Sequence, residues 1–426
     1  MNSLHRVLTT VGLSIGLTGL PAAGLAQSQL SSAAHLHRAG VEQLNRQRYS
    51  EAITYLNQAI AADPDYAPAY FQRGLAHAAQ QDYSAAIADY TQALNRQPEL
   101  GEAYFHRGVA YYHLNDDSAA LADLNRALEF NHQHAVAYFY RGMIHHRMGN
   151  SSSAIADFTE AIALDANYEA AYLNRGSVFY TLGQPATAAD DFDAVIQRNP
   201  ASAIAYHNRG FAHAALGDPA SALMDFDQAI ALQPNYAAAY LGRGLMRSVL
   251  GDPSGGFADL TQAIALAPTQ ATAYKVRGDL RLQQGDATGA IADYDRALAL
   301  RPDYREVYKS RAVARVAAGD IEAADADYSE FLAAYPTHAE ALNNRGDLRA
   351  SVGDLEGAMT DYSQAIQANP QYAEAHYSRA TLRLETGDWQ GAMADFERAA
   401  QLYLQQGKAE GYRNALRQRQ SLEAGR

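Results

Sequence analysis

The stretch Tyr104-Phe105-His106-Arg107-Gly108 decides the fold, because its Arg-Gly pair returns along the chain at a fixed interval. Successive copies are separated by 34 residues or a multiple of 34, with no insertion or deletion. The pair stands at residues 73–74, 107–108, 141–142, 175–176, 209–210, 243–244, 277–278 and 345–346. Two more copies, at Arg311 and Arg379, carry Ala in place of Gly. A fixed period of this size is the signature of a repeat solenoid.

Eleven repeats run from residue 33 to residue 406, and we number positions so that the recurrent Gly is position 8. Position 4 is Tyr in eight repeats, position 20 is Ala in ten, position 24 is aromatic in eight and position 27 is Ala in nine. These residues fall at helical spacing, which predicts two amphipathic helices per repeat. Gly-Asp at positions 15 and 16 predicts the turn between them, because Gly ends a helix and Asp caps the next.

This pattern resembles the tetratricopeptide repeat. Gly at position 8, Ala at 20, an aromatic residue at 24, Ala at 27 and Pro at 32 match that family, while Tyr replaces its usual Trp at position 4 and Arg replaces Leu at position 7. The resemblance implies an all-α, right-handed α-solenoid of eleven 34-residue helix-turn-helix repeats, with a concave face made by the first helix of each repeat. It also implies a role in binding other proteins.

The ends of the chain differ from the repeats. Residues 1–26 are expected to be a signal peptide or an N-terminal anchor, with His5 and Arg6 before an uncharged apolar core at 7–20 and cleavage after Ala26. That core is shorter than the roughly 20 apolar residues of a membrane span. Residues 27–32 are expected to form a linker, 33–406 the repeat array and 407–426 a C-terminal capping helix. The repeats are therefore predicted to be periplasmic or otherwise exported.

Composition excludes several classes of function. A net charge of −13 argues against nucleic acid, which needs clustered Lys and Arg. The chain has no cysteine, so disulfides, thiolate metal sites and cysteine nucleophiles are excluded. Histidines gather at His106, His113, His145 and His146, but no Glu or His stands four residues from His145 on its own helix, so we expect neither metal nor cofactor. No motif predicts catalysis, and no membrane span is expected in the mature chain unless the signal is retained.

Each Arg at position 7 has a companion in its own repeat. Position 23 is Asp in ten repeats, from Asp89 to Asp395, and the one repeat without the Arg, at Ala39, also lacks the Asp and has Tyr55. We expect the two to pair between the helices and form a structural ladder. A charged stripe that grips a ligand is the alternative.

Aromatic residues vary around the fixed positions of the early repeats. They occupy positions 5 and 12 of the first helix, which the resemblance places on the concave face, and the flanking position 6, and rings are the residue types that carry interface energy. The predicted partner-binding residues are Phe71, Phe105, His106, Tyr112, Phe139, Tyr140, Leu173 and Tyr180. The alternative is that some of these rings pack against the next repeat.

Position 11 changes character along the chain. It is His, Tyr or Phe from His77 to His213, and then Arg at 247, 281, 315, 349 and 383. We expect these Arg side chains to form surface ion pairs, with counter-charges from Glu306, Glu340, Glu374, Asp279 and Asp347. The alternative is a clamp for a carboxylate or an acidic segment.

These observations predict an exported, non-enzymatic scaffold that binds protein or extended peptide segments on its concave face and so assembles complexes. A second hypothesis is an accessory or regulatory subunit of an envelope enzyme or transport machine. The two differ in whether one stoichiometric partner copurifies with the chain.

Overall fold

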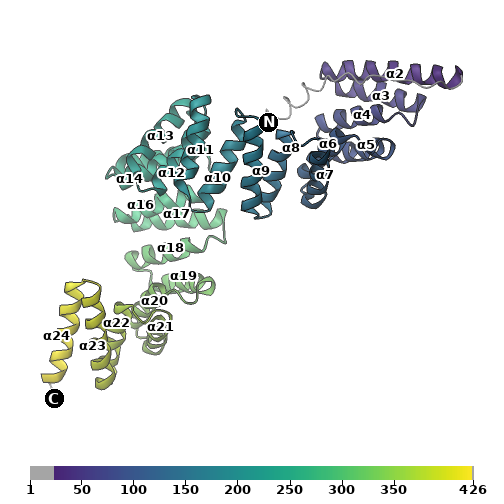
Figure 1. The fold of residues 1–426 in the computed structure, drawn as a ribbon. Coiled ribbons are helices and arrows are strands. Elements are labelled where there is room, and N and C mark those ends of the chain that lie inside the picture. The colour runs from purple at the N-terminus through teal and green to yellow at the C-terminus, as the bar shows by residue number, and fades with distance from the viewer. Residues whose placement is uncertain (1–23, 425–426) are drawn as a thin grey trace. The chain divides into compact units, whose positions relative to one another are not determined.

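The structure is a computed structural model that describes residues 24–424, and every regular element in that range is an α-helix (Figure 1). Within those residues 23 helices, α2 to α24, follow one another in regular helix-turn-helix repeats. The all-α repeat architecture expected from the sequence is confirmed. The chain divides into two compact units, an N-terminal unit that ends at Leu216 and a C-terminal unit that begins at Gly217.

Each repeat supplies a first helix and a second helix, in that order. The helices of the N-terminal unit are α2 (Gly24–Asn45), α3 (Tyr49–Ala62), α4 (Ala67–Ala79), α5 (Tyr83–Arg96), α6 (Gly101–His113), α7 (Asp117–Phe130), α8 (Ala135–Arg147), α9 (Ser151–Leu164), α10 (Glu169–Thr181), α11 (Pro185–Arg198) and α12 (Ala203–Ala215).

The C-terminal unit continues the same alternation, beginning with the second helix of the sixth repeat. Its helices are α13 (Pro219–Leu232), α14 (Ala237–Val249), α15 (Pro253–Leu266), α16 (Ala271–Gln283), α17 (Ala287–Leu300), α18 (Arg305–Ala318), α19 (Ile321–Ala334), α20 (Ala339–Ser351), α21 (Leu355–Ala368), α22 (Ala373–Glu385), α23 (Trp389–Gln405) and α24 (Ala409–Ala424).

The turn inside each repeat follows the chemistry that the Gly-Asp pair predicts. Gly285 adopts φ +84°, a left-handed conformation that favours glycine, and ends α16. The side chain of Asp286 then accepts a hydrogen bond from the backbone N–H of Gly289 at 2.8 Å and caps α17. The second repeat has Gln81 instead of Gly and still reaches φ +64°.

The glycine at position 8 brings the two helices of a repeat together. A Cβ added to Gly74 would lie 2.6 Å from the ring of Tyr90, and one added to Gly142 would lie 2.8 Å from the ring of Phe158. Both rings are completely buried. The ring at position 24 therefore packs directly on the backbone of the first helix in these repeats, where a larger residue would require the ring to shift.

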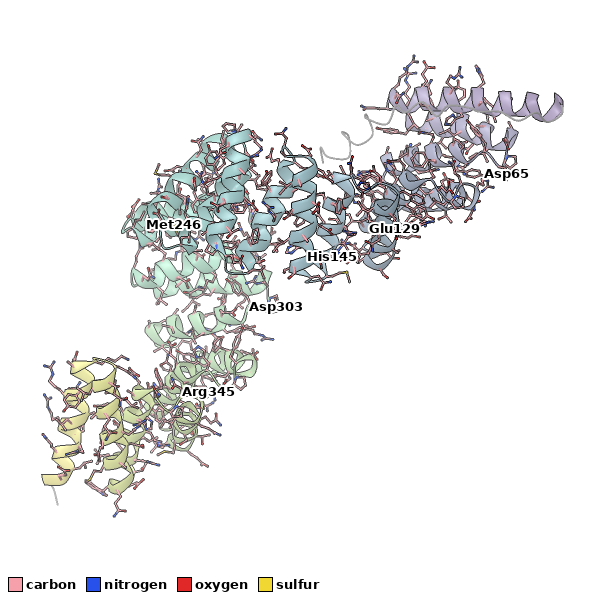
Figure 2. The ribbon with its side chains drawn as sticks, viewed as in Figure 1. Asp65, Glu129, His145, Met246, Asp303 and Arg345 are labelled. Atoms are coloured by element: carbon pink, nitrogen blue, oxygen red, sulfur yellow. The ribbon has the colours of Figure 1, made fainter. Side chains whose placement is uncertain are left out.

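First helices of successive repeats also contact one another. In the N-terminal unit α4 contacts α6, α6 contacts α8 and α8 contacts α10, beside the contacts that each makes with its own second helix. We call this layer of α4, α6, α8 and α10 the inner surface of the N-terminal unit. Figure 2 shows the side chains that the successive repeats carry.

The ends of the described chain show how the array is closed. Helix α24 packs on α23, where Leu422 contacts Phe396, so the described part of the expected C-terminal cap is indeed a helix. Helix α2 begins at Gly24 and includes residues 27–32, where we expected a linker. Most of the expected signal, residues 1–23, lies outside the described residues. Among helices α2 to α24, none has the length and apolar character needed to cross a membrane.

Candidate functional site

The Arg at position 7 and the Asp at position 23 form a ladder of ion pairs. The Nε and Nη2 atoms of each Arg donate to the two carboxylate oxygens of its Asp at 2.6–3.0 Å, and the Asp side chains are only 1–9% exposed. These bonds join Arg73–Asp89, Arg107–Asp123, Arg141–Asp157, Arg175–Asp191, Arg243–Asp259, Arg277–Asp293, Arg311–Asp327, Arg345–Asp361 and Arg379–Asp395. The expected pairing is confirmed.

The third nitrogen of each guanidinium links neighbouring repeats. Nη1 of the Arg donates to position 25 in the second helix of the preceding repeat, which the sequence did not lead us to expect. The acceptors are Asn57, Thr91, Asn125, Thr159, Asp193, Asp227, Thr261, Asp295, Ser329 and Ser363. Each Arg thus ties its own second helix to the previous one, which makes the ladder structural.

Tyr at position 4 completes the environment of this Arg. In the eight repeats that have it, the guanidinium carbon lies 5.2–5.8 Å from the centre of the Tyr ring one turn earlier. A cation over the face of a ring is attracted by its electron density. Arg at position 7 and Tyr at position 4, the two departures from the family pattern, therefore belong to one local arrangement.

Position 11 makes the difference between the two units. In the last five repeats a second guanidinium reaches the Asp at position 23 at 2.7–3.0 Å, through Arg247, Arg281, Arg315, Arg349 and Arg383. In the N-terminal unit His77 and His145 stand 3.8 Å from Asp89 and Asp157. The ion-pair interpretation is confirmed, because these Arg side chains are held by carboxylates of their own repeats.

The counter-charges expected for position 11 were assigned to the wrong carboxylates. Asp279 pairs with Lys275 at 2.6 Å, and Glu374 pairs with Lys408 at 2.6 Å. Glu340 lies 3.6 Å from Lys309. The Glu306 carboxylate accepts a hydrogen bond from the hydroxyl of Tyr335. Asp347 accepts bonds from Tyr362 and from an asparagine, so the buried Asp at position 23 is what binds the second Arg.

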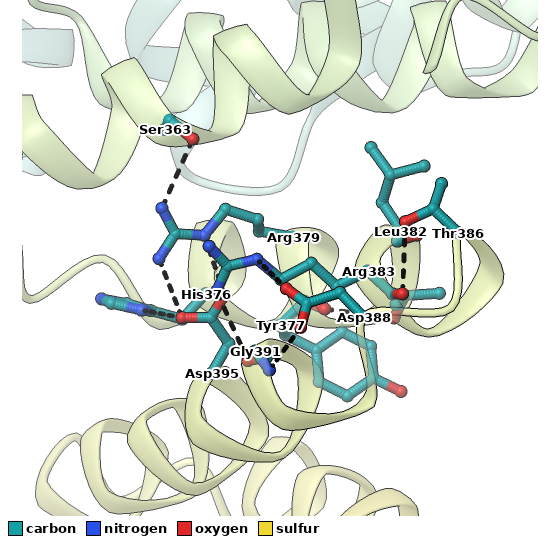
Figure 3. A network of polar contacts seen from close by, with 11 residues as sticks. Ser363, His376, Tyr377, Arg379, Leu382, Arg383, Thr386, Asp388, Gly391 and Asp395 are labelled. Atoms are coloured by element: carbon teal, nitrogen blue, oxygen red, sulfur yellow. Dashed lines mark hydrogen bonds and ion pairs between the residues drawn. The ribbon is translucent and has the colours of Figure 1, made fainter. Parts of the chain in front are cut away.

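The last repeat shows the C-terminal arrangement in full (Figure 3). Arg379 lies between Ser363 and Asp395, and Arg383 reaches the same carboxylate at 2.7 Å. Burial acts to raise the pKa of Asp395, but the bonds from His376 and Arg379 and the nearby positive charges outweigh it and hold this pKa at about 2. The carboxylate therefore stays ionised wherever the protein is folded at ordinary pH.

Three of the eight expected partner-binding residues are buried. Phe71, Phe105 and Tyr140 are 7%, 1% and 7% exposed, because their rings fill the space between adjacent repeats. Phe71 packs against Tyr90 of its own repeat, with ring centres 5.9 Å apart, and Phe105 packs near Tyr140 of the next repeat at 6.3 Å. These rings pack mainly in the core, as the alternative interpretation of the sequence expected, and their part in partner binding stays a prediction.

The other five residues keep some access to solvent. His106, Phe139 and Leu173 are half-buried, and Phe139 packs on Phe158 at 5.8 Å. Tyr112 is also half-buried, under the guanidinium of Arg147 at 4.5 Å. Tyr180 is exposed at 38%. Tyr112 and Tyr180 are thus the rings of the set that a partner reaches most directly.

A pocket lies among α4, α5, α6 and α8 of the N-terminal unit and brings three of the predicted residues together. It holds about 450 Å³ when its open mouth is counted, but its cavity volume is only about 30 Å³. Its lining consists of Leu75, Ala78, Ala79, Tyr83, Tyr90, Phe105, His106, Val109, Ala110 and Tyr140. Burial lowers the pKa of His106 to about 3, with His134 contributing, so its ring is neutral near pH 7. The pocket wall therefore carries no charge.

Tyr90 is a pocket residue that sequence reasoning assigned only to the core. Its side chain is completely buried and its hydroxyl has no hydrogen-bond partner within the protein. The corresponding hydroxyls of Tyr294 and Tyr362 donate to Asp279 and Asp347 at position 9, at 2.9 and 2.8 Å. Position 9 of the second repeat is Leu75 instead of Asp, and this difference is visible in the sequence.

Among residues 24–424, no group of three or more His, Asp or Glu side chains is placed to hold a metal ion. His113 instead stacks on Tyr83, with ring centres 4.5 Å apart.

Comparison with known proteins identifies the family. Models described as tetratricopeptide repeat match residues 37–98, 71–135, 139–203 and 203–236, and a model described as TPR repeat matches 278–319 and 346–387. Together these matches cover more than half of the chain, which belongs to the tetratricopeptide repeat family. Proteins of this family are generally non-enzymatic interaction scaffolds. No curated protein matches the sequence.

Solved structures are also similar to this chain, at low sequence identity. A tetratricopeptide repeat protein from Parabacteroides merdae is 17% identical, with 58% of this chain and 98% of that one covered and a TM-score of 0.49. Yeast Tom70 is 17% identical, with 93% and 96% covered and a TM-score of 0.40. YrrB, described as a TPR protein with an unusual peptide-binding site, is 23% identical, with 43% and 95% covered and a TM-score of 0.39.

Proposed function

We propose that this protein is an exported, non-enzymatic scaffold that binds segments of other proteins on the inner surface of its N-terminal unit. The tetratricopeptide-repeat fold supports an interaction scaffold in general. The observation that carries the specific proposal is the uncharged, ring-lined pocket between α4, α5, α6 and α8, the kind of concave apolar site that ligands prefer. Tyr112 and the exposed Tyr180 lie on the same layer of first helices.

We propose that the C-terminal unit has a structural role and does not bind partners. Its distinctive residues, the Arg side chains at position 11, are already engaged with buried carboxylates. Releasing one of them to a ligand would leave an Asp with one fewer cation in a buried site, which is costly.

Affinity capture with the full chain tests the proposal. A Tyr112→Ala/Tyr180→Ala variant removes the two accessible rings of the inner surface, while a Val352→Ala/Trp389→Ala variant removes exposed apolar groups of the C-terminal unit as a matched control. We expect proteins retained by the wild type to be lost from the first variant and kept by the control. Retention by all three chains, or loss only from the control, would refute the proposed surface.

Export is proposed on the sequence of residues 1–26 alone, with its short apolar core and small residues before the cleavage point. Expression of the full chain in a bacterial host, followed by N-terminal sequencing of the cell-envelope fraction, tests it. We expect a mature chain beginning at Gln27. An intact N-terminus in the cytoplasmic fraction would count against export.

A further inference from the structure

Tyr90 stands out among the tyrosines at position 24, because it reproduces the packing of its counterparts without their hydrogen bond. Its ring lies over Gly74 as the rings of Tyr294 and Tyr362 lie over Gly278 and Gly346, with added-Cβ distances of 2.6, 2.7 and 2.6 Å. The hydroxyls therefore occupy equivalent places in their repeats. In the eighth and tenth repeats the hydroxyl donates to an Asp at position 9, whereas position 9 of the second repeat is Leu75.

A buried hydroxyl without a partner is uncommon, because leaving a polar group unsatisfied costs about 1–3 kcal/mol. Leu75 and Tyr90 both line the pocket, so the unpartnered hydroxyl belongs to a residue of the pocket wall. In the eighth and tenth repeats the chain itself supplies the acceptor for this hydroxyl, through Asp279 and Asp347. In the second repeat a bound partner can supply the hydrogen-bonding atom.

We propose that this pocket takes one uncharged side chain of a bound protein segment, with an apolar stem and a terminal amide, carbonyl or hydroxyl group that hydrogen-bonds to Tyr90. This inference rests on the proposed function and names the chemistry that its site selects. The small cavity volume, about 30 Å³, admits the tip of a side chain rather than a free ligand. Glutamine is the side chain that matches this description most closely.

The lining determines that the occupant is neutral. Ala78, Ala79, Val109 and Ala110 offer only methyl groups to the stem. The carboxylate that binds Tyr294 is balanced by Lys275 at 2.6 Å, but no residue lining this pocket bears an ammonium or guanidinium group. A carboxylate in the pocket would be desolvated without a cation, and a charged amine would lack a carboxylate, so both are disfavoured.

Selection from a phage-displayed library of random short peptides, with the full chain as bait, tests the inference. We expect enrichment of peptides that share a Gln or a similar neutral polar residue. Their affinity should fall about threefold to tenfold in Tyr90→Phe, which removes only the hydroxyl, as expected for one hydrogen bond. The matched control is Tyr362→Phe, which should leave peptide affinity unchanged.

A second variant keeps the test independent of folding defects. Leu75→Asn places an amide at position 9, where Asp serves the eighth and tenth repeats, and should satisfy Tyr90 internally. We expect it to lose the selected peptides by tenfold or more while the chain stays helical by circular dichroism.

The outcomes separate the two levels of the proposal. Peptides that bind wild type and Tyr90→Phe equally, or that share a charged or purely apolar residue, would overturn the pocket inference and leave the scaffold function standing. That result would also follow if a water molecule alone serves the hydroxyl. Failure to enrich any peptide would overturn both.

Discussion

The two units of this protein are built on the same repeat but stabilise its buried Asp differently. In the fourth repeat Asp157 is held by Arg141, with His145 at 3.8 Å, whereas in the tenth repeat Asp361 is held by Arg345 and by Arg349 at 3.0 Å. In the C-terminal repeats the second guanidinium forms an additional ion pair with the buried Asp. The N-terminal repeats have rings at the same position, and the pocket lies among the helices of this unit. On this difference rests our proposal that the N-terminal unit binds partners and that the C-terminal unit has a structural role.

The largest expected effect comes from removing one rung of the ladder in each unit. Among the described residues Arg175 is the ion-pair partner of Asp191, so Arg175→Ala should destabilise the protein by about 3–5 kcal/mol, the cost of leaving a buried charge unpaired. Arg345→Ala should cost clearly less, because Arg349 still holds Asp361. Urea unfolding of both variants measures the two costs. Equal losses would show that the second guanidinium does not matter.

The position-24 tyrosines give the next comparison. Tyr362→Phe removes a hydrogen bond to Asp347, and bonds to charged groups contribute about 1.5–3 kcal/mol, so the melting temperature should fall. Tyr90→Phe removes a hydroxyl that has no protein partner and should leave the unliganded protein as stable or slightly more stable. Thermal unfolding by circular dichroism distinguishes the two. A similar loss in both variants would mean that Tyr90 has a partner in solution.

Acid should weaken the N-terminal unit first. Burial lowers the pKa of His37, His106, His113, His134 and His207, all in that unit. These groups are neutral when folded and bind protons when unfolded, so stability is complete above the ordinary pKa of about 6.5 and falls below it. At pH 5 the lowered pKa of His106, about 3, reduces the free energy of unfolding by up to about 2 kcal/mol relative to its value above pH 6.5.

The C-terminal unit should resist this change. The lowered pKa of Asp395, about 2, means that its contribution is complete above the ordinary Asp value and is lost only as the pH falls toward 2. Trp389, the single tryptophan, reports on this unit by fluorescence, while circular dichroism reports on the whole chain. Between pH 7 and pH 5 the unfolding midpoint measured by circular dichroism should fall, whereas the midpoint measured by fluorescence should stay the same. An equal shift of both midpoints would contradict the assignment of the acid-sensitive groups to the N-terminal unit. His106→Asn should reduce the pH dependence of the circular-dichroism midpoint.

The smallest expected effect is an exchange at position 11. His145→Arg places a second guanidinium beside Asp157 and should stabilise the fourth repeat by up to about 1 kcal/mol, as a partly exposed ion pair does. Arg349→His, the reverse change, should lose a comparable amount. Urea midpoints compare the two variants. Destabilisation by His145→Arg would show that the neighbouring rings, not charge, determine this position.

Much of the fold could be predicted because eleven copies of one pattern restrict each other. The coincident absence of Arg and Asp in the first repeat predicted their pairing correctly, and the Gly-Asp pairs predicted the turns. The link from each Arg to position 25 was missed because that position varies among Asn, Thr, Asp and Ser, although all of them accept hydrogen bonds.

The candidate site was predictable only in part. Helical spacing placed Phe105 on the first helix but could not say whether its ring faces solvent or the next repeat, and the structure buries it at 1% exposure. The pocket depends on how side chains from four helices fill a common space, which periodicity does not encode. Tyr90 could have been noticed, because Leu75 stands where Asp279 and Asp347 stand in other repeats.

Hydrogen–deuterium exchange of the full chain, with and without a selected peptide, tests the division between the units most directly. A bound segment should protect the amides of α4, α6 and α8 and leave those of α14 to α22 unchanged. Protection confined to the C-terminal unit would contradict the account, because it would place the binding surface on the repeats that we assign to support.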